Sequence, residues 1–516
     1  MSLFPSGALQ GVTGPVAIQV QEDSMHTHTH MHIHSCALLA AVALGTAATP
    51  AIADTTAVRF ATFNASLNRD ASGQLLADLA NPAGGSLSGA TGRRILQAHN
   101  VAEILQRVNA DVLLVNEFDF DLNGTATASS LAMPLGYSSQ AAQRFQDNFL
   151  SAAHGNAVRG STAALQYAYR FTPNTNTGLA SGYDLNNNGV VAGGDDAWGF
   201  GNYAGQYGMT IYSKYQIVGV RSFQTFKWKD MPRNLLTSDP VVGANNLANF
   251  YSADETANLR LSSKNHVDVT VRINGQDVHF LTAHPTPPTF DGNEDRNGKR
   301  NHDEIRFWAD YVDGASYIYD DQGGTGGLAA GAKFVIAGDY NADPLDGDSF
   351  KGIVSGQAYN AIGQLLNNPL VNTGVTPSST GGTAAASYPS NNGTANASHV
   401  GDPSQDTADF SDSAPGNLRV DYVLPSANLA INGAGVFWPV DPDTGVGNTT
   451  GDLFDLVGTF RDPNLYANLA SSDHKAVWVD VSITAVPEPG SWALLLGGLA
   501  LFGVAKRGHA GCRTSR

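Results

Sequence analysis

The sequence predicts an α/β fold with two layers of sheet, and three observations support this prediction. Short apolar runs rich in Val, Ile and Phe recur along the chain, as in buried strands. Amphipathic segments with apolar residues at helical spacing lie between them. The composition, 42% hydrophobic and 15% charged over 516 residues, supplies enough apolar side chains for a large core. Strands that alternate with helices are typical of α/β chains.

The strand and helix signals follow one another along most of the chain. Apolar or alternating runs predict strands at 58–65, 111–116, 207–213, 267–273, 277–283, 333–337, 419–424 and 476–483. Periodic apolar residues predict helices at 95–108 and 302–312. The run 111–116 is almost continuously apolar, which is typical of a central strand.

Three other stretches interrupt this pattern and predict surface insertions. They are residues 140–205, 225–262 and 366–416. The last is rich in Ser, Thr, Gly and Asn and poor in apolar residues, so we expect it to form a loop over the surface.

The first 53 residues predict an address signal and not a part of the fold. An apolar run at 37–44 precedes Ala51-Ile52-Ala53, small residues of the kind that signal peptidase recognises. We expect cleavage near Asp54, which leaves residues 54–485 as the folded domain. Residues 1–24 are interpreted as an over-extended start, upstream of the true initiation site.

Residues 486–516 predict a second address signal. Val486-Pro487-Glu488-Pro489 precedes an apolar run at 492–505 and then Lys506-Arg507. This order resembles the PEP-CTERM sorting signal of Gram-negative bacteria, which an exosortase recognises. The resemblance implies a short transmembrane helix with its basic end in the cytoplasm. The alternative is a buried C-terminal helix.

Net charge and cysteine content narrow the function further. The formal net charge of −17 disfavours long-range attraction of nucleic acid, unless a local basic groove exists. The two cysteines, Cys36 and Cys512, lie inside the predicted signals. The mature protein is therefore expected to have neither disulfides nor cysteine metal sites.

Two polar motifs at strand ends carry the chemistry. Gly338-Asp339-Tyr340-Asn341 directly follows the buried run 334–337, and Ser472-Asp473-His474 stands just before the strand 476–483. Strand ends hold side chains rigidly, so carboxylates and imidazoles from two of them can converge on one metal ion and one phosphate.

Together with other strand ends, these motifs resemble the endonuclease/exonuclease/phosphatase superfamily. The resemblance covers about residues 56–484, apart from the insertions, and its motifs are in the family's order. They are Phe60-Ala61-Thr62-Phe63-Asn64, the strand that ends in Asn116-Glu117, the strand 206–215, Leu281-Thr282-Ala283-His284, Gly338-Asp339-Tyr340-Asn341, Arg419-Val420-Asp421-Tyr422 and Ser472-Asp473-His474. The resemblance implies a four-layer sandwich of two mixed β-sheets flanked by helices.

The resemblance also implies a metal site with oxygen ligands. Glu117 is the first choice of ligand, with Asn64 beside it and Asp473 as a further ligand to the metal or its water. A hard cation such as Mg²⁺, or Mn²⁺, binds few carboxylates and keeps several waters, which suits this set.

The catalytic groups implied by the resemblance surround that site. Asp339 and Asn341 are expected to orient the attacking water and a phosphate oxygen, with Asp339 as general base. His474 is expected to donate to the phosphoryl oxygens, or to act as the base, and Asp421 to hold its ring. His284 is expected to be a second phosphate-binding or acid histidine, and the sequence does not identify its carboxylate partner.

A separate loop has the spacing of a calcium site. Residues 184–195 place oxygen side chains at positions 1, 3, 5 and 12 and a glycine at position 6, as in EF-hand loops. The expected Ca²⁺ ligands are Asp184, Asn186, Asn188 and Asp195. The alternative is a flexible Asn/Gly-rich loop, since no clear helix flanks it.

A polar cluster at 291–304 follows His284. Arg296, Lys299 and Arg300 from this cluster are expected to form a rim that binds the anionic substrate. The alternative is a solvated loop.

Three functions are consistent with these features. The first is an exported phosphoesterase acting on phosphomonoesters or phosphodiesters of small or medium size. The second is an extracellular DNA endonuclease, and the third is a non-catalytic surface or matrix-binding protein. Any of them is expected at the cell surface, at the outer membrane or in the extracellular matrix of a Gram-negative bacterium. The acidic net charge favours the first over the second, because a duplex binder needs several phosphate contacts.

Overall fold

The computed structural model describes residues 54–120, 139–387, 394–440, 451–458 and 470–485. By internal contacts the chain divides into residues 1–51 and 52–516, and only the second part contains described residues. The predicted signal peptide and sorting segment both lie outside the described residues. Within the described ranges, no helix combines the length and the apolar character needed to cross a bilayer.

The first sheet is mixed and has β1 and β2 at its centre. Its strand order is β16 (Ile431–Phe437), β17 (Ala476–Thr484), β1 (Thr55–Leu67), β2 (Val112–Phe118), β6 (Met209–Ser213) and β5 (Tyr169–Phe171). β1 is antiparallel to β17 and parallel to β2. All but one of the residues of β2 are buried, as its continuous apolar run predicted.

The second sheet is also mixed. Its strand order is β15 (Asp421–Pro425), β10 (Lys333–Asp339), β9 (Gln276–Ala283), β8 (His266–Ile273) and β7 (Gln216–Ser222). β10 runs parallel to β9 and antiparallel to β15, in a register that places Asp339 opposite Asp421.

The two sheets pack face to face, and alternation along β10 shows how. Val335 and Ala337 belong to the core shared with the first sheet, whereas Phe334 and Ile336 belong to a second core on the opposite face. Since successive strand residues point to opposite faces, the second sheet is buried on both sides. This confirms the prediction of two layers of sheet.

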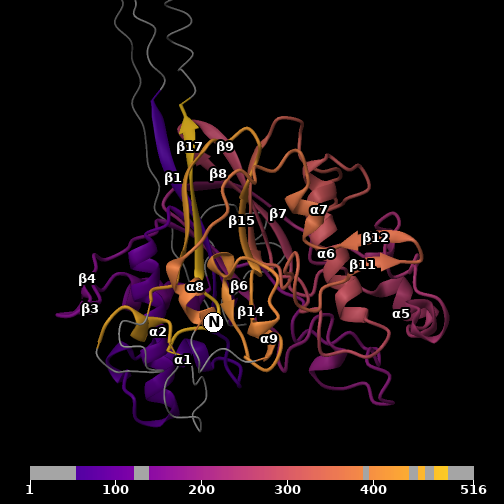
Figure 1. Cartoon of the computed structure of the whole chain (residues 1–516), viewed down its shortest axis with the longest axis horizontal. Helices are drawn as coiled ribbons and strands as arrows, with labels where there is room; N and C mark the ends of the chain where they lie inside the picture. Colours follow the sequence, from indigo (N-terminus) through magenta and orange to yellow (C-terminus); the bar gives the residue numbers. More distant parts are fainter. Residues whose placement is uncertain (1–53, 121–138, 388–393, 441–450, 459–469, 486–516) are drawn as a thin grey trace, which may run out of the picture. The chain divides into compact units, whose positions relative to one another are not determined.

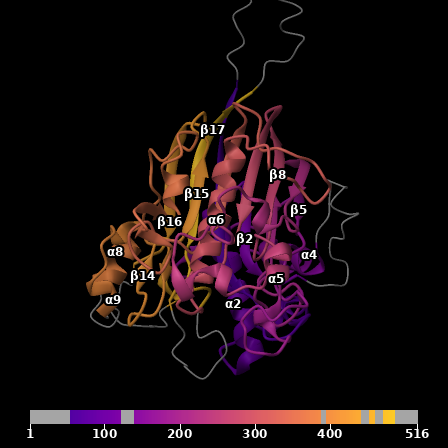
Figure 2. The same cartoon turned by 90° about the vertical axis from the view of Figure 1, so that its right-hand side faces the viewer.

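Helices complete a four-layer sandwich. α2 (Gly89–Val108) contributes Ile95, Val101 and Leu105 to the core of the first sheet, and α6 (Arg296–Val312) contributes apolar residues to the second core. Figure 1 shows these two helices on opposite sides of the strands, and Figure 2 is viewed from the α6 side. The fold implied by the sequence motifs is therefore confirmed.

The remaining helices and strand pairs are short. The short helices are α1 (Gln74–Leu79), α4 (Gln140–Phe145), α5 (Ala253–Asn258), α7 (Gly363–Leu366), α8 (Thr380–Ser387) and α9 (Thr394–Ala397). Two-stranded pairs are β3 (Gly155–Asn156) with β4 (Gly160–Ser161), β11 (Lys351–Val354) with β12 (Gln357–Asn360), and β13 (Ala408–Asp409) with β14 (Asn417–Leu418). The stretch 366–416 is not wholly superficial, because Ala408 is fully buried and bridges to His474.

Candidate active site

Strand termini from both sheets meet at one end of the sandwich. Glu117 is the penultimate residue of β2, Asp339 is the last of β10, and Asp421 is the first of β15. His284 directly follows β9, and His474 stands two residues before β17. The backbone at Glu117 has a φ of 54°, an uncommon value for a residue other than glycine. Such conformations concentrate at functional sites.

Asn64 of β1 joins the two sheets at this end. Its amide Nδ2 donates to Oε1 of Glu117 at 3.1 Å and to Oδ2 of Asp339 at 2.9 Å. Its oxygen accepts from the backbone N–H of Ser66 at 3.2 Å. Asn64 therefore orients one carboxylate from each sheet, and its amide nitrogen, not its oxygen, faces them.

His474 is held by a carboxylate, as the sequence motifs implied. Its Nδ1 lies 2.8 Å from Oδ2 of Asp421, and both side chains are buried. The hydroxyl of Thr407 donates to the same Asp421 oxygen at 2.9 Å and accepts the backbone N–H groups of Val420 and Asp421. This arrangement fixes the orientation of the imidazole before any ligand binds.

Asp339 lies at the centre of the cluster. Its Oδ2 is 3.4 Å from Nε2 of His284 and 3.7 Å from Nε2 of His474. Its Oδ1 accepts the backbone N–H of Asn341 at 2.9 Å, and Asn341 itself has a φ of 51°. Asp339 is thus the carboxylate that lies beside the imidazole of His284.

Burial and neighbouring charge separate the protonation states of these groups. Burial raises the pKa of Asp339 to about 6, although His474 opposes this shift. Burial disfavours a charged His474, but the carboxylates of Asp421 and Asp339 outweigh that effect and hold its pKa well above the ordinary value. His474 therefore carries a proton at neutral pH.

His284 has the opposite state. Burial, with Lys264 and His474 nearby, moves the pKa of its imidazole well below the ordinary value. Its Nδ1 is buried and has no hydrogen-bond partner among the described residues. The site thus contains one protonated and one neutral histidine, on either side of a single carboxylate.

Glu117 and Asp473 form an acidic pair that fits a hard cation. Burial and the charge of Asp473 raise the pKa of Glu117, which indicates that its negative charge is poorly compensated by the protein. The hydroxyls of Ser66 and Ser472 lie 3.4 Å from Oδ1 of Asp473. Carboxylate oxygens are the ligands that Mg²⁺ and Mn²⁺ prefer, and a bound cation would relieve this repulsion.

A second set of potential metal ligands overlaps the histidine pair. One ligand atom each of Asp339, Asp421 and His474 lies within 4.8 Å of the others. A protonated imidazole cannot bind a cation, and His474 holds its proton tightly between two carboxylates. The oxygen groups around Glu117 therefore fit the metal better than this triad does.

Sequence reasoning missed a buried cation in the site. Lys264 precedes β8, is only 6% exposed, and feels the charges of Glu304, Glu117 and Asp339. Burial lowers the pKa of its ammonium group despite these carboxylates. The sequence offered one indication of this role, which is the position of Lys264 just before β8, the strand that pairs with β9. Thr407 had none, because it lies in the polar stretch 366–416.

The predicted anion-binding rim of Arg296, Lys299 and Arg300 is wrong for Lys299. α6 begins at Arg296, so these residues lie in a helix and not in a loop. The ammonium of Lys299 is fully buried and lies 2.7 Å from Asp239. Arg300 donates to the backbone carbonyls of residues 198, 260 and 261. Arg296 pairs with Glu294. Lys299 and Arg300 thus hold the insertions in place. Arg296 and Arg300 also line the cavity beside Glu117, so anion binding by these two stays a prediction.

The calcium-like loop differs from its expected ligand set at one position. Asp184 and Asn186 accept backbone N–H groups of residues 188 and 189, and Asn188 accepts the N–H of Val190. Asp196, not Asp195, is the buried acid that closes the loop, because it accepts the N–H groups of residues 185 and 192. Asp195 is exposed and lines a cavity beside Glu117. Calcium binding stays a prediction.

Fold and site together define a two-sheet sandwich with a buried carboxylate and histidine centre at one end. The sequence matches the Endonuclease/Exonuclease/phosphatase family over residues 61–474. The chain therefore belongs to this family, whose members are typically metal-dependent hydrolases of phosphoesters. A search of curated proteins finds no significant match.

Solved structures with distant similarity include three bacterial proteins. One is an endonuclease/exonuclease/phosphatase family protein from Leptotrichia buccalis (13% identity, 82% of this chain and 99% of that chain, TM-score 0.36). Another is a β-toxin variant from Staphylococcus aureus with bound magnesium ions (15%, 84% and 100%, TM-score 0.35). The third is sphingomyelinase C from Streptomyces griseocarneus (14%, 82% and 99%, TM-score 0.34). The family assignment does not depend on these likenesses.

Proposed function

We propose that this protein is an exported, divalent-metal-dependent phosphoesterase that hydrolyses phosphomonoesters or phosphodiesters. The observation that supports the proposal most strongly is the unbroken chain of contacts from Glu117 through Asn64 and Asp339 to His474 and Asp421. These residues come from both sheets and from segments hundreds of positions apart. Burying acids and histidines lowers the stability of the fold. Mutually oriented sets of such groups therefore concentrate at functional sites.

Each group has a role that suits its protonation state. A Mg²⁺ or Mn²⁺ ion held by Glu117 and Asp473 would supply Lewis-acid polarisation of a phosphoryl oxygen. The protonated His474 donates a hydrogen bond to another phosphoryl oxygen, and Asp421 keeps it charged and oriented. Asp339 accepts the proton of the attacking water. Neutral His284, and Lys264 close to Glu117, complete the polar lining.

Export is the part of the proposal that rests on sequence alone. The apolar run at 37–44 with its small-residue cleavage site supports processing by signal peptidase, and the tail 486–516 supports processing by an exosortase after passage through the membrane. The protein would then act at the cell surface, at the outer membrane or in the extracellular matrix.

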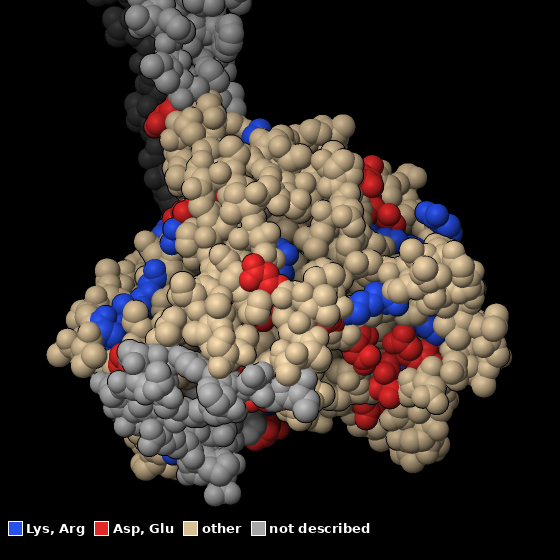
Figure 3. Space-filling view, in the orientation of Figure 1, with Lys and Arg blue, Asp and Glu red and all other residues tan. Residues whose placement is uncertain are grey.

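On the face of the molecule drawn in Figure 3, the distribution of charge favours a small substrate over duplex DNA. On the face drawn in Figure 3, basic side chains form small, separate groups and not a continuous band. On the side where Figure 1 places α6, basic and acidic side chains lie next to each other. A duplex-binding nuclease needs several phosphate contacts along one groove.

The test is hydrolysis by the purified full-length chain with Mg²⁺, Mn²⁺ or Ca²⁺. Substrates are plasmid DNA, bis(para-nitrophenyl) phosphate, para-nitrophenyl phosphate and phytate. We expect metal-dependent hydrolysis of a small ester, abolished by a chelator and restored by Mg²⁺ or Mn²⁺. Cleavage of plasmid DNA alone would select the nuclease instead. Inactivity on every substrate with every metal would favour the non-catalytic binding protein.

A further inference from the structure

Glu117, the proposed metal ligand, lines a cavity of about 540 Å³. Lys264 and Thr286 line it as well, so a group bound there would lie against the proposed metal site. This volume lies within the range of pockets for small molecules.

Segments predicted as insertions build much of its wall. Leu185, Asp195 and Phe200 come from the stretch 140–205, and Tyr251 and Leu259 come from the stretch 225–262. Because these segments lie outside the strands that carry the catalytic residues, the cavity is a feature added to the catalytic frame. Its chemistry therefore bears on which substrate is selected and not on how the phosphoester is cleaved.

Aromatic rings dominate the apolar part of the wall. Phe200, Tyr207, Tyr251 and Phe290 line the cavity, and the rings of Phe200 and Tyr207 are 6.3 Å apart. Phe200 is 54% exposed and Phe290 is 85% exposed. Exposed large apolar side chains that gather at the mouth of a cavity typically mark a binding surface.

Two of the three cations in the wall are already engaged, and the third, Lys264, is buried and close to Glu117. Arg296 pairs with Glu294, and Arg300 donates to three backbone carbonyls. Neither is therefore available to follow an extended phosphate backbone. The exposed carboxylate of Asp195 adds a hydrogen-bond acceptor that disfavours further anionic groups in the cavity.

We propose that this cavity binds a planar aromatic group, of the size of a nucleobase, that is joined to the scissile phosphate directly or through a sugar. The natural substrate is then a small aromatic phosphoester, either a nucleotide or an aryl phosphate. This inference rests on the proposed phosphoesterase function and adds the class of substrate to it. Stacking on Phe200 and Phe290 provides the selectivity, and Asp195 accepts N–H groups from the edge of a base.

The test compares competitive inhibitors that share a phosphate monoester and differ only in the attached group. Thymidine 5′-monophosphate, phenyl phosphate, glycerol 3-phosphate and dodecyl phosphate are each titrated against hydrolysis of bis(para-nitrophenyl) phosphate by the full-length chain with Mg²⁺. We expect an aromatic inhibitor to bind at least about 5-fold more tightly than glycerol 3-phosphate, from the typical strength of one stacked ring. A preference for thymidine monophosphate alone identifies a nucleotide, and an equal preference for phenyl phosphate identifies an aryl ester.

Matched variants assign the preference to the cavity. Phe200→Ala and Phe290→Ala are expected to remove it by weakening the aromatic inhibitor about 5- to 100-fold, with the inhibition constant of glycerol 3-phosphate unchanged. Phe200→Tyr and Phe290→Tyr are expected to retain it. Equal binding of all four inhibitors would overturn the inference, and so would tightest binding of dodecyl phosphate.

Failure of the proposed function gives a different pattern. If the chain hydrolyses none of the esters, calorimetric titration of the same four ligands still tests the cavity directly. Aromatic preference by calorimetry without hydrolysis would support aromatic binding in the cavity and reject the phosphoesterase function. Hydrolysis without aromatic preference would support the phosphoesterase function and reject aromatic binding in the cavity.

Discussion

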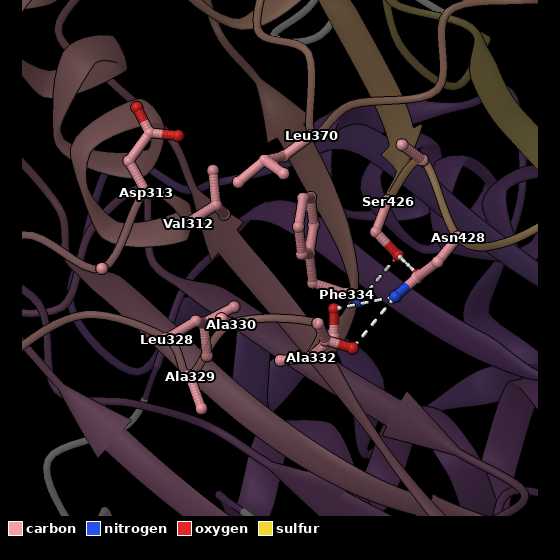
Figure 4. Close-up of a pocket in the computed structure, with 13 residues that line it drawn as sticks. Val312, Asp313, Leu328, Ala329, Ala330, Ala332, Phe334, Leu370, Ser426 and Asn428 are labelled. Carbon is pink, nitrogen blue, oxygen red and sulfur yellow. Dashed lines mark hydrogen bonds between the residues drawn. The ribbon is translucent and has the colours of Figure 1, made fainter.

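Two cavities of the same size, about 540 Å³ each, differ in the residues that line them. One lies beside Glu117 and has charged and aromatic walls. The other, shown in Figure 4, is lined by Val312, Leu328, Phe334 and small residues of the loop 329–332. Ser426 accepts the N–H of Phe334 and donates to Asn428, and Asp313 accepts a hydrogen bond from Asn368.

The second sheet runs between the cavity of Figure 4 and the active site. β10 begins at Lys333, its second residue Phe334 lines the cavity of Figure 4, and it ends with Asp339 in the active site. β15 runs the other way, from Asp421 in the site to Pro425, next to Ser426. One end of each strand therefore carries a buried acid of the active site, and the other end lies at or next to a residue that lines the cavity of Figure 4. Cavity volume alone does not identify a functional site, whereas poorly compensated charge does.

The largest expected effect is a loss of turnover when the active site is changed, which is not expected for changes in the cavity of Figure 4. Glu117→Gln and His474→Ala are each expected to reduce kcat by at least about 100-fold, because each removes one electrostatic or acid–base group. Glu117→Gln should also raise the Mg²⁺ concentration needed for half-maximal rate. The measurements are steady-state kinetics and a thermal unfolding curve. Near-normal rates in both variants would remove the site assignment.

A smaller effect tests whether residues outside the predicted set position the catalytic histidine. Thr407→Val removes the hydroxyl that holds Asp421, so His474 loses part of its support, and we expect kcat to fall about 10-fold. Because Asp421 raises the pKa of His474, the basic limb of the pH–rate profile should move to lower pH. Thr407→Ser should restore both. An unchanged profile with a reduced melting temperature would instead indicate a purely structural role.

A third prediction separates the pH dependence of the fold from that of the site. Burial lowers the pKa of His266 to about 3, and the ring packs against Phe307 and Trp308. The unfolded chain takes up this proton near pH 6.5 and the folded chain does not, so stability is full above pH 6.5 and falls as the pH drops toward 3. The slope is at most about 1.4 kcal/mol per pH unit.

Chemical denaturation at pH 7.5 and pH 5 measures this slope. His266→Gln is the matched variant, and its free energy of unfolding is expected to change less between the two pH values. The same slope in both proteins would assign the acid sensitivity to other groups.

The smallest expected effect is the control in the cavity of Figure 4. Asn428 is exposed and donates to the carbonyls of Gly331 and Ala332. Asn428→Ala is expected to cost about 1 kcal/mol or less of stability and to leave kcat and KM unchanged. A large loss of turnover in this variant would contradict the functional contrast between the two cavities.

Much of the fold was predictable because strand periodicity is a local property. The runs that became β1, β2, β8, β9, β10 and β17 have continuous or alternating apolar residues, and each forms a strand close to its expected limits. The polar cluster at 291–304 shows where this reasoning fails. It resembles a solvated loop, yet Asp303 is buried in α6, where it accepts hydrogen bonds from Trp228 and Leu235. A charged helix face is stable in the interior only if distant partners satisfy it, and those partners leave no local pattern.

The sequence by itself determined that Glu117, Asp339 and His474 stand at the ends of strands, because hydrophobic periodicity locates a strand end within a few residues. Only the tertiary structure decided that Asn64 bridges two sheets, that Thr407 supports Asp421, and that Lys264 is buried in the site while Lys299 is locked in an ion pair. The physical reason is that burial and pairing of charge depend on groups brought together from distant parts of the chain. The energy of a buried charge is set by that whole environment and not by its neighbours in sequence.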